Sequence, residues 1–222
     1  MTATIHETAA EAVADIEDGS TVMLGGFGLA GMAVQLIDAL IEQGATGLTV
    51  ISNNAGNGDA GLAALLAEGR VRKMICSFPR QHDSWVFDGL YRAGRIDLEL
   101  VPQGTLAERM RAAGAGIGAF YCPTGVGTPL AEGKETREID GRTHVLEYPL
   151  RADVALIGAH IADRMGNTVY RKTARNFGPV MAAAATTTVM QVREIVETGR
   201  LDPETIVTPS IYVNRVVAVG SA

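Results

Sequence analysis

The sequence is poor in cysteine, in positive charge and in long apolar runs. Its 222 residues contain two cysteines, Cys76 and Cys122, with no C-x-x-C spacing, so we expect neither a disulfide framework nor a metal site. The formal charge of −6 argues against nucleic acid or an anionic membrane as the main partner. No segment approaches the roughly 18 apolar residues of a membrane-spanning helix.

What is present is typical of a soluble globular enzyme. Hydrophobic residues make up 47% of the chain, which is long enough to bury the core of one α/β domain. Acidic residues are spread through the first 19 positions without an apolar segment, so this region resembles neither a signal peptide nor a transit peptide. We therefore interpret residues 1–222 as a single cytoplasmic domain.

Short apolar runs alternate with segments of helical periodicity along much of the chain. Strands are predicted at 21–24, 48–52, 71–76, 96–101 and 152–160, and helices at 9–16, 34–41, 62–66, 86–91 and 106–112. Trp85 and Tyr91 lie at helical spacing and are expected in the core. This alternation predicts an α/β fold with a mainly parallel, doubly wound sheet.

The pattern changes after residue 114, where glycines and prolines interrupt the periodicity. Residues 136–150 are predicted to form a hairpin, with Asp140 and Gly141 as its two-residue turn. Residues 186–196 are predicted to form one further strand. We expect one domain with an irregular, hairpin-containing middle insertion.

A glycine motif follows the first predicted strand. Gly26, Gly28 and Gly31 match G-x-G-x-x-G, the pattern of dinucleotide-binding turns. Such sites also need an acidic residue at the end of the second strand, to hold the adenine ribose. Here that strand runs into 51–54, Ile-Ser-Asn-Asn, which has no carboxylate. An NAD or FAD site is therefore disfavoured.

The turn nevertheless suits an anionic or carbonyl ligand. Glycines allow backbone N–H groups to approach a ligand closely, and a helix N-terminus favours negative charge. The alternative is a tight strand-to-helix crossing in which the glycines serve packing alone. A basic cluster at Arg171, Lys172 and Arg175 also has two interpretations: it could hold phosphates, or it could form a solvated face.

Amide side chains follow two of the predicted strands. Asn53 and Asn54 come after the second strand, and Gln103 comes after the strand at 96–101. Because parallel strands place ligands at their carboxyl ends, these groups could hold a carboxylate or a thioester carbonyl. The alternative is that the asparagines cap a turn and Gln103 faces solvent.

The stretch "DGSTVMLGGFGLAGM" (18–32) resembles the signature of family I CoA-transferases, except that Ala33 stands where a proline is usual. The similarity continues through 48–56, 101–128, 133–141, 162–185 and 211–217. The segment at 76–99 is similar to the 3-oxoadipate branch of that family, which acts in aromatic catabolism through the β-ketoadipate pathway.

The resemblance implies an A subunit whose fold is similar to that of phosphosugar isomerases. In this family a glutamate in a Ser-Glu-Asn-Gly motif on the B subunit is the nucleophile, and this sequence has no such motif. We therefore expect no catalytic nucleophile here, activity only with the B subunit, and an A2B2 heterotetramer. Succinyl-CoA would be a substrate, with no permanently bound cofactor.

The resemblance also implies roles for particular residues. The turn would contact CoA through Gly25, Gly26, Phe27, Gly28, Leu29, Ala30 and Gly31. Asn53 and Gln103 would support catalysis near the acyl group. Arg80, chosen for its place in the branch-specific segment, and Asn54 are further candidates for contact with substrate.

Two alternatives remain open at this point. The first is the acetoacetate branch of the same family, which transfers CoA from succinyl-CoA to other 3-oxo acids. The second is a non-catalytic sugar-phosphate-binding sensor of similar fold, although no basic DNA-binding stretch accompanies the domain.

Overall fold

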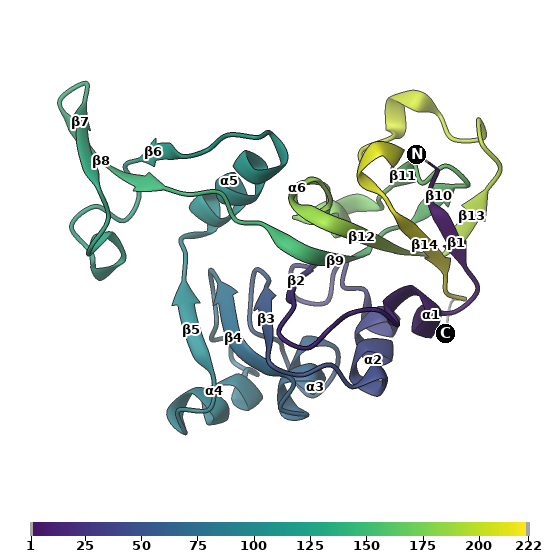
Figure 1. Cartoon of the computed structure of the whole chain (residues 1–222), viewed down its shortest axis with the longest axis horizontal. Coiled ribbons are helices and arrows are strands. Elements are labelled where there is room, and N and C mark those ends of the chain that lie inside the picture. Colours follow the sequence, from purple (N-terminus) through teal and green to yellow (C-terminus); the bar gives the residue numbers. More distant parts are fainter. Residues whose placement is uncertain (1, 221–222) are drawn as a thin grey trace.

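The computed structural model describes residues 2–220 and is built around an eight-stranded sheet (Figure 1). Its strand order is β1-β14-β12-β9-β2-β3-β4-β5, and every neighbouring pair is parallel. The strands are β1 (Thr4–His6), β2 (Thr21–Leu24), β3 (Leu48–Ile51), β4 (Val71–Cys76), β5 (Asp97–Leu100), β9 (Ala152–Gly158), β12 (Ala185–Val192) and β14 (Arg215–Ala218). The predicted parallel sheet is confirmed.

Helices cover both faces of the sheet, as its strands require because they are apolar on both sides (Figure 1). One face packs against α1 (Ala9–Val13), α2 (Val34–Gln43), α3 (Leu62–Ala67) and α4 (Trp85–Arg92), and the other against α5 (Gln103–Gly114) and α6 (Gly178–Ala184). Strand β2 shows the alternation: Val22 and Leu24 enter the first core, and Met23 enters the second. The doubly wound arrangement is confirmed.

Two small sheets lie outside the main one. The first consists of β11 (Thr168–Val169), β10 (Ile161–Asp163) and β13 (Glu194–Val196), and the second of β6 (Phe120–Cys122), β8 (Arg142–Glu147) and β7 (Thr136–Ile139). The second forms an arm that projects from the body in Figure 1. Asp140 and Gly141 both have positive φ, +49° and +71°, so the predicted two-residue turn is confirmed.

Short 3-10 segments complete the chain, at η1 (Pro129–Ala131), η2 (Lys172–Arg175), η3 (Pro203–Thr205) and η4 (Ser210–Tyr212). Among the described residues, no helix combines the length and the apolar character needed to cross a membrane.

Two predicted elements have different bounds in the structure. Residues 186–196 are not one strand, because the chain leaves the main sheet after β12 and β13 pairs with β10. The N–H of Arg193, at this break, donates to the carbonyl of His160 (3.0 Å). Helix α5 begins at Gln103 rather than at the predicted Leu106. The sequence did not reveal this start, because the first turn, Gln-Gly-Thr, carries no apolar periodicity.

The expectation that Trp85 and Tyr91 belong to the core is wrong. Their side chains are 59% and 48% exposed, and Phe87 is the aromatic residue of α4 that is buried. Tyr91 instead stacks on Phe87, with ring centroids 5.7 Å apart. The helical spacing was real, but it did not identify which face of α4 meets the sheet.

Strands β2 and β9 are neighbours at the point where the strand order reverses: successive strands are added in one direction from β2 and in the other from β9. Strands β3, β4 and β5 lie on one side of this point, and β12, β14 and β1 on the other. In open α/β sheets such a switch point leaves a crevice at the carboxyl ends of the strands. The glycine motif follows β2 at this edge.

Candidate functional site

The residues after β2 form a tight, projecting turn. Gly26, Gly28 and Gly31 all have positive φ, +134°, +60° and +79°, a region that costs other residues energy. Phe27 and Ala30 exchange two backbone hydrogen bonds, with N···O distances of 3.0 and 3.3 Å. The turn therefore presents its tip to solvent, and Phe27 is 54% exposed.

Close backbone contacts fix the base of the turn. A Cβ atom at Gly31 would lie 2.3 Å from the carbonyl oxygen of Ala174, and one at Gly158 would lie 2.7 Å from the oxygen of Gly31. No side chain fits at either position without moving the backbone. The motif thus serves packing as well as presentation of the turn.

Asn176 holds the turn from the opposite side and was not assigned a role from the sequence. Its Oδ1 accepts from the N–H of Gly26 (3.1 Å), and its Nδ2 donates to the carbonyl of Ala30 (2.8 Å). Its own backbone is strained, with φ +21° and ψ −116°, and the contacts of its side chain must maintain this conformation. The only sequence signal was an asparagine before Phe-Gly-Pro, which does not reveal a partner 150 positions away.

Two amides predicted as site residues meet at the carboxyl ends of β3 and β5. Asn53 is 2% exposed, and its Oδ1 accepts from Nε2 of Gln103 and from Oγ of Ser77, both at 2.8 Å. The backbone carbonyl of Asn53 accepts the N–H groups of Ser77 and Phe78. Because the Oδ1 is already bonded, the Nδ2 of Asn53 is the group left to donate to a ligand.

This amide pair lies in a hollow of about 680 Å³. It is lined by Phe27, Asn53, Ser77, Phe78, Arg80, Gln81, His82 and Gln103. The structure thus brings together four residues predicted separately from the sequence, namely Phe27, Asn53, Arg80 and Gln103. None of the residues that line the hollow carries a carboxylate or a thiol.

The lining therefore favours binding over nucleophilic attack. Neutral amide donors and a guanidinium can stabilise a carbonyl oxygen on which negative charge develops. The Oγ of Ser77 donates to Asn53, and no hydrogen bond joins it to His82 in the described chain, so no serine–histidine pair is formed. Burial raises the pKa of the Cys76 thiol, at the end of β4, to about 12, so it stays protonated at neutral pH.

Arg80 reaches the rim of the hollow while paired to a carboxylate. Its Nε and Nη2 both donate to Asp88 of α4, which also accepts from Arg92 (3.4 Å). The hydrogen bond from Arg80 lowers the pKa of Asp88, so this carboxylate remains ionised and holds the guanidinium in place. Arg92 does not line the hollow.

Asn54 lies apart from the amide pair. It is buried, its Oδ1 accepts the N–H of Gly56 (3.0 Å), and it does not line the hollow. This geometry is the local Asx turn that the sequence offered as the alternative.

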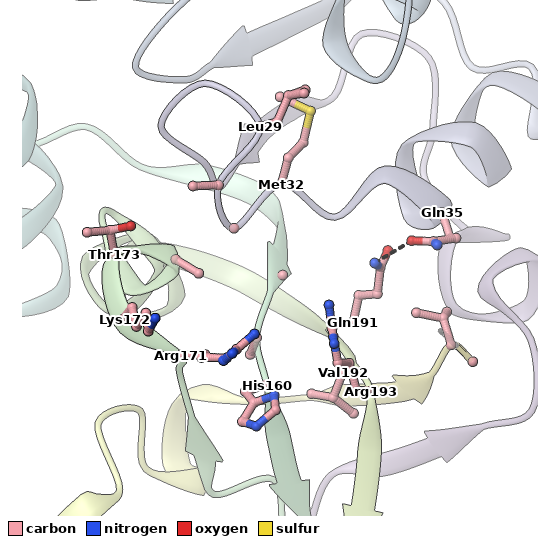
Figure 2. A pocket seen from close by; sticks show the side chains of 17 residues that line it. Leu29, Met32, Gln35, His160, Arg171, Lys172, Thr173, Gln191, Val192 and Arg193 are labelled. Atoms are coloured by element: carbon pink, nitrogen blue, oxygen red, sulfur yellow. Dashed lines mark hydrogen bonds between the residues drawn. The ribbon is translucent and has the colours of Figure 1, made fainter. Parts of the chain in front are cut away.

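The basic cluster lies on the other side of the glycine turn. Arg171 and Lys172 line a hollow of about 500 Å³ at the switch point (Figure 2). Lys172 and Arg175 line another hollow, of about 630 Å³, that Phe27 and Ala30 border. The turn thus separates an amide-lined region from a cationic one.

Comparison with known proteins shows which family has this sequence. Residues 6–219 match the family described as Coenzyme A transferase. The chain belongs to that family. Its matched span includes every site residue named above, and this membership favours the enzyme over the non-catalytic sensor alternative.

Curated relatives in the family align over nearly the full chain. The A subunit of the 3-oxoadipate CoA-transferase from Pseudomonas putida is 68% identical over 217 residues, which cover 98% of this chain and 94% of that protein. The A subunit of the probable succinyl-CoA:3-ketoacid coenzyme A transferase from Bacillus subtilis is 51% identical and covers 95% of this chain and 88% of that protein.

Solved structures of other CoA-transferases have the same fold. An acyl-CoA transferase apoenzyme from Escherichia coli O157:H7 is 25% identical with a TM-score of 0.85; the match covers 98% of this chain and 47% of that one. This chain thus spans about half of that longer polypeptide. Glutaconate coenzyme A-transferase from Acidaminococcus fermentans, at 20% identity and a TM-score of 0.87, shows the fold alone; it covers 98% of this chain and 76% of that one.

Proposed function

We propose that this chain is the A subunit of a CoA-transferase that moves CoA from succinyl-CoA to 3-oxoadipate in aromatic catabolism. The observation that carries the proposal is the Asn53–Gln103 amide pair, set in a hollow that holds donors but no nucleophile. The name of the 68% identical Pseudomonas putida relative supports the choice of acid. In this proposal residues 1–222 act as the single domain of that subunit.

The nucleophile comes from a partner, as in the family that the sequence resembles. A glutamate carboxylate of the B subunit attacks the thioester carbonyl of succinyl-CoA, and CoA thiolate leaves to give a mixed anhydride. The thiolate then attacks the glutamyl carbonyl, releases succinate and forms a glutamyl-CoA thioester. The carboxylate of 3-oxoadipate reverses these steps and leaves as its CoA thioester.

The residues of this chain stabilise charge during those steps. Each addition places negative charge on a carbonyl oxygen, and the Nδ2 of Asn53 and the free N–H of Gln103 are neutral donors oriented before the reaction begins. Phe27 lines the same hollow and gives it an apolar wall beside the amide pair. CoA is a substrate here, with no permanently bound cofactor.

Two features support a partner and a dicarboxylic substrate. The relatives are named as A subunits, which fits an A2B2 assembly with the active site at the A–B interface. Arg80 and His82 line the hollow beside the amide pair, where a guanidinium suits the distal carboxylate of 3-oxoadipate. Acetoacetate has no distal carboxylate. A transferase for such 3-oxo acids is the second candidate, and the 51% identical relative, whose name gives a 3-ketoacid as substrate, supports it.

A reconstitution assay tests the proposal. We expect CoA transfer from succinyl-CoA only when the purified chain is mixed with a B subunit that carries Ser-Glu-Asn-Gly. We also expect kcat/KM for 3-oxoadipate to exceed that for acetoacetate by about tenfold or more, the scale of one charge-assisted contact. CoA transfer by the isolated chain would contradict a nucleophile on the B subunit. A preference for acetoacetate would favour the second candidate.

A further inference from the structure

The hollow at the switch point is lined by cations. It occupies about 500 Å³ between the segments that follow β2, β9 and β12, and Arg171, Lys172 and Arg193 line it (Figure 2). In Figure 2 the guanidinium groups of Arg171 and Arg193 point toward its centre. No aspartate or glutamate is among the lining residues. Within residues 2–220, none of these three cations forms an ion pair.

The backbone that carries these cations is fixed. Ala174 N–H donates to the carbonyl of Arg171 (3.2 Å), and Arg193 N–H donates to that of His160 (3.0 Å). Lys172 has a φ of +52°, a strained conformation for a side-chain-bearing residue that the surrounding contacts must maintain. Cations that converge on one hollow without a carboxylate partner can form charge-assisted hydrogen bonds to an anion placed there.

The first turn of helix α2 borders the same hollow. Gln191 caps this helix, because its Oε1 accepts the N–H of Leu36 (3.1 Å) and its Nε2 donates to Gln35 (Figure 2). The first turn contains no acidic residue. The positive end of a ten-residue helix therefore adds to the field of the arginines.

Three hollows form a track around the glycine turn. The switch-point hollow and the hollow lined by Arg175 share Ala30, Lys172 and Thr173 as lining residues. The hollow lined by Arg175 shares Phe27 with the one that holds the amide pair. One end of the track is thus cationic, its middle passes the exposed turn, and its far end presents neutral amides.

We propose that the switch-point hollow binds the phosphates of the CoA nucleotide through Arg171, Lys172 and Arg193. CoA has the matching polarity, with a diphosphate and a 3′-phosphate at one end and an uncharged pantetheine arm that ends in the thioester. The arm passes along Phe27 and Ala30 and delivers the acyl carbonyl to Asn53 and Gln103. This inference rests on the proposed function, which makes a CoA thioester the substrate.

Kinetics with two thioesters test the assignment in the reconstituted A–B complex. We expect Arg171→Ala and Arg193→Ala each to raise KM for succinyl-CoA roughly tenfold or more, as for loss of a charge-assisted hydrogen bond. KM for succinyl-pantetheine, which lacks the nucleotide, should stay within about twofold. Arg200→Ala, which removes an exposed arginine outside the three hollows, is the matched control and should change neither value.

Calorimetric titration with adenosine 3′,5′-bisphosphate provides a readout that does not need turnover. The wild-type complex should bind it, and the Arg171→Ala/Arg193→Ala double variant should bind it at least tenfold more weakly. Equal effects on both thioesters, or unchanged binding of the bisphosphate, would overturn the assignment. So would loss of A–B association in the double variant, because the cations would then serve the partner chain. A wild-type complex that binds the bisphosphate yet transfers no CoA would instead refute the proposed function alone.

Discussion

Two arginines share the carboxylate of Asp88, but only one of them borders the amide-lined hollow. Arg80 donates to Asp88 through two nitrogens, whereas Arg92 approaches through one at 3.4 Å. The pair is exposed, so it adds little to stability. It holds the Arg80 guanidinium at the rim of the hollow, where we propose that the distal carboxylate of the substrate binds.

We expect Arg80→Ala to raise KM for 3-oxoadipate roughly tenfold, because a charged hydrogen bond to the distal carboxylate is lost. KM for succinyl-CoA should change much less, which steady-state kinetics of the A–B complex would measure. Arg92→Ala is the matched control, since it removes the other partner of Asp88 and leaves the hollow intact. Similar increases in both KM values for Arg80→Ala would remove Arg80 from the substrate site.

At the residue scale, the sequence predicted those candidate residues whose position follows from strand order. Asn53 and Gln103 directly follow parallel strands, and parallel strands end at one edge, so their approach could be predicted. Asn176 could not be found in this way, because its bond to Gly26 depends on how two distant segments pack. Asn54 is adjacent to Asn53 in sequence, and only the structure shows that Asn53 lines the hollow whereas Asn54 forms a turn.

A carboxylate on β5 connects several elements around the amide pair. Glu99 accepts from Lys73 of β4 (2.6 Å) and from Arg109 of α5 (3.0 Å), and Arg109 also donates to the carbonyl of Tyr148 (2.8 Å). Burial alone would raise the pKa of Glu99, but the hydrogen bonds from Lys73 and Arg109 outweigh it and lower the pKa. These contacts fix the edge strand and the helix whose first residue is Gln103.

Replacing this carboxylate should give a pH-dependent loss of stability. Because the pKa of Glu99 is lower in the folded state than its ordinary value of 4.5, its contribution is present above that value and disappears as pH falls through the folded pKa. We expect Glu99→Gln to reduce the free energy of unfolding by about 1–2 kcal/mol at pH 7. Below pH 4.5 the difference should shrink.

Urea unfolding at a series of pH values measures this effect. Glu108→Gln is the control. Glu108 pairs with Arg111 at the exposed surface of α5, so its replacement should change the free energy of unfolding little. A constant difference between Glu99→Gln and wild type across the pH range would contradict an electrostatic contribution from Glu99.

At the element scale, periodicity located the central strands and missed several short ones. Strands such as β4 carry enough apolar residues to stand out, whereas β1, β6 and β10 have three residues each. The break between β12 and β13 was invisible for a related reason. Apolar residues continue across it, and only the pairing of β13 with β10 shows that the chain has changed sheets.

The whole molecule presents its glycine turn and the three hollows around it at one edge of the sheet. Exposed Phe27, Leu29 and Phe78 lie around them, and such apolar side chains are typical of a surface that a partner covers. The three-stranded arm extends away from the body (Figure 1). The overall shape thus offers two separate surfaces for assembly.

For the assembled enzyme we expect a particle with two copies of each polypeptide, because an active site formed between A and B still leaves the arm available to a second heterodimer. Sedimentation equilibrium of the mixed polypeptides would measure its mass. A stable particle with one A and one B would contradict the A2B2 stoichiometry.

The strand order also has a consequence for synthesis on the ribosome. Strands β2 to β5 are consecutive in both sequence and space, so they can pair once about 100 residues have been made. Strand β9 then adds beside β2, and β12 and β14 follow outward, whereas β1 must wait for β14 near the end of the chain. The crevice between β2 and β9, and the Asn176 contact that steadies its turn, therefore form late in translation, on a half-sheet that is already in place.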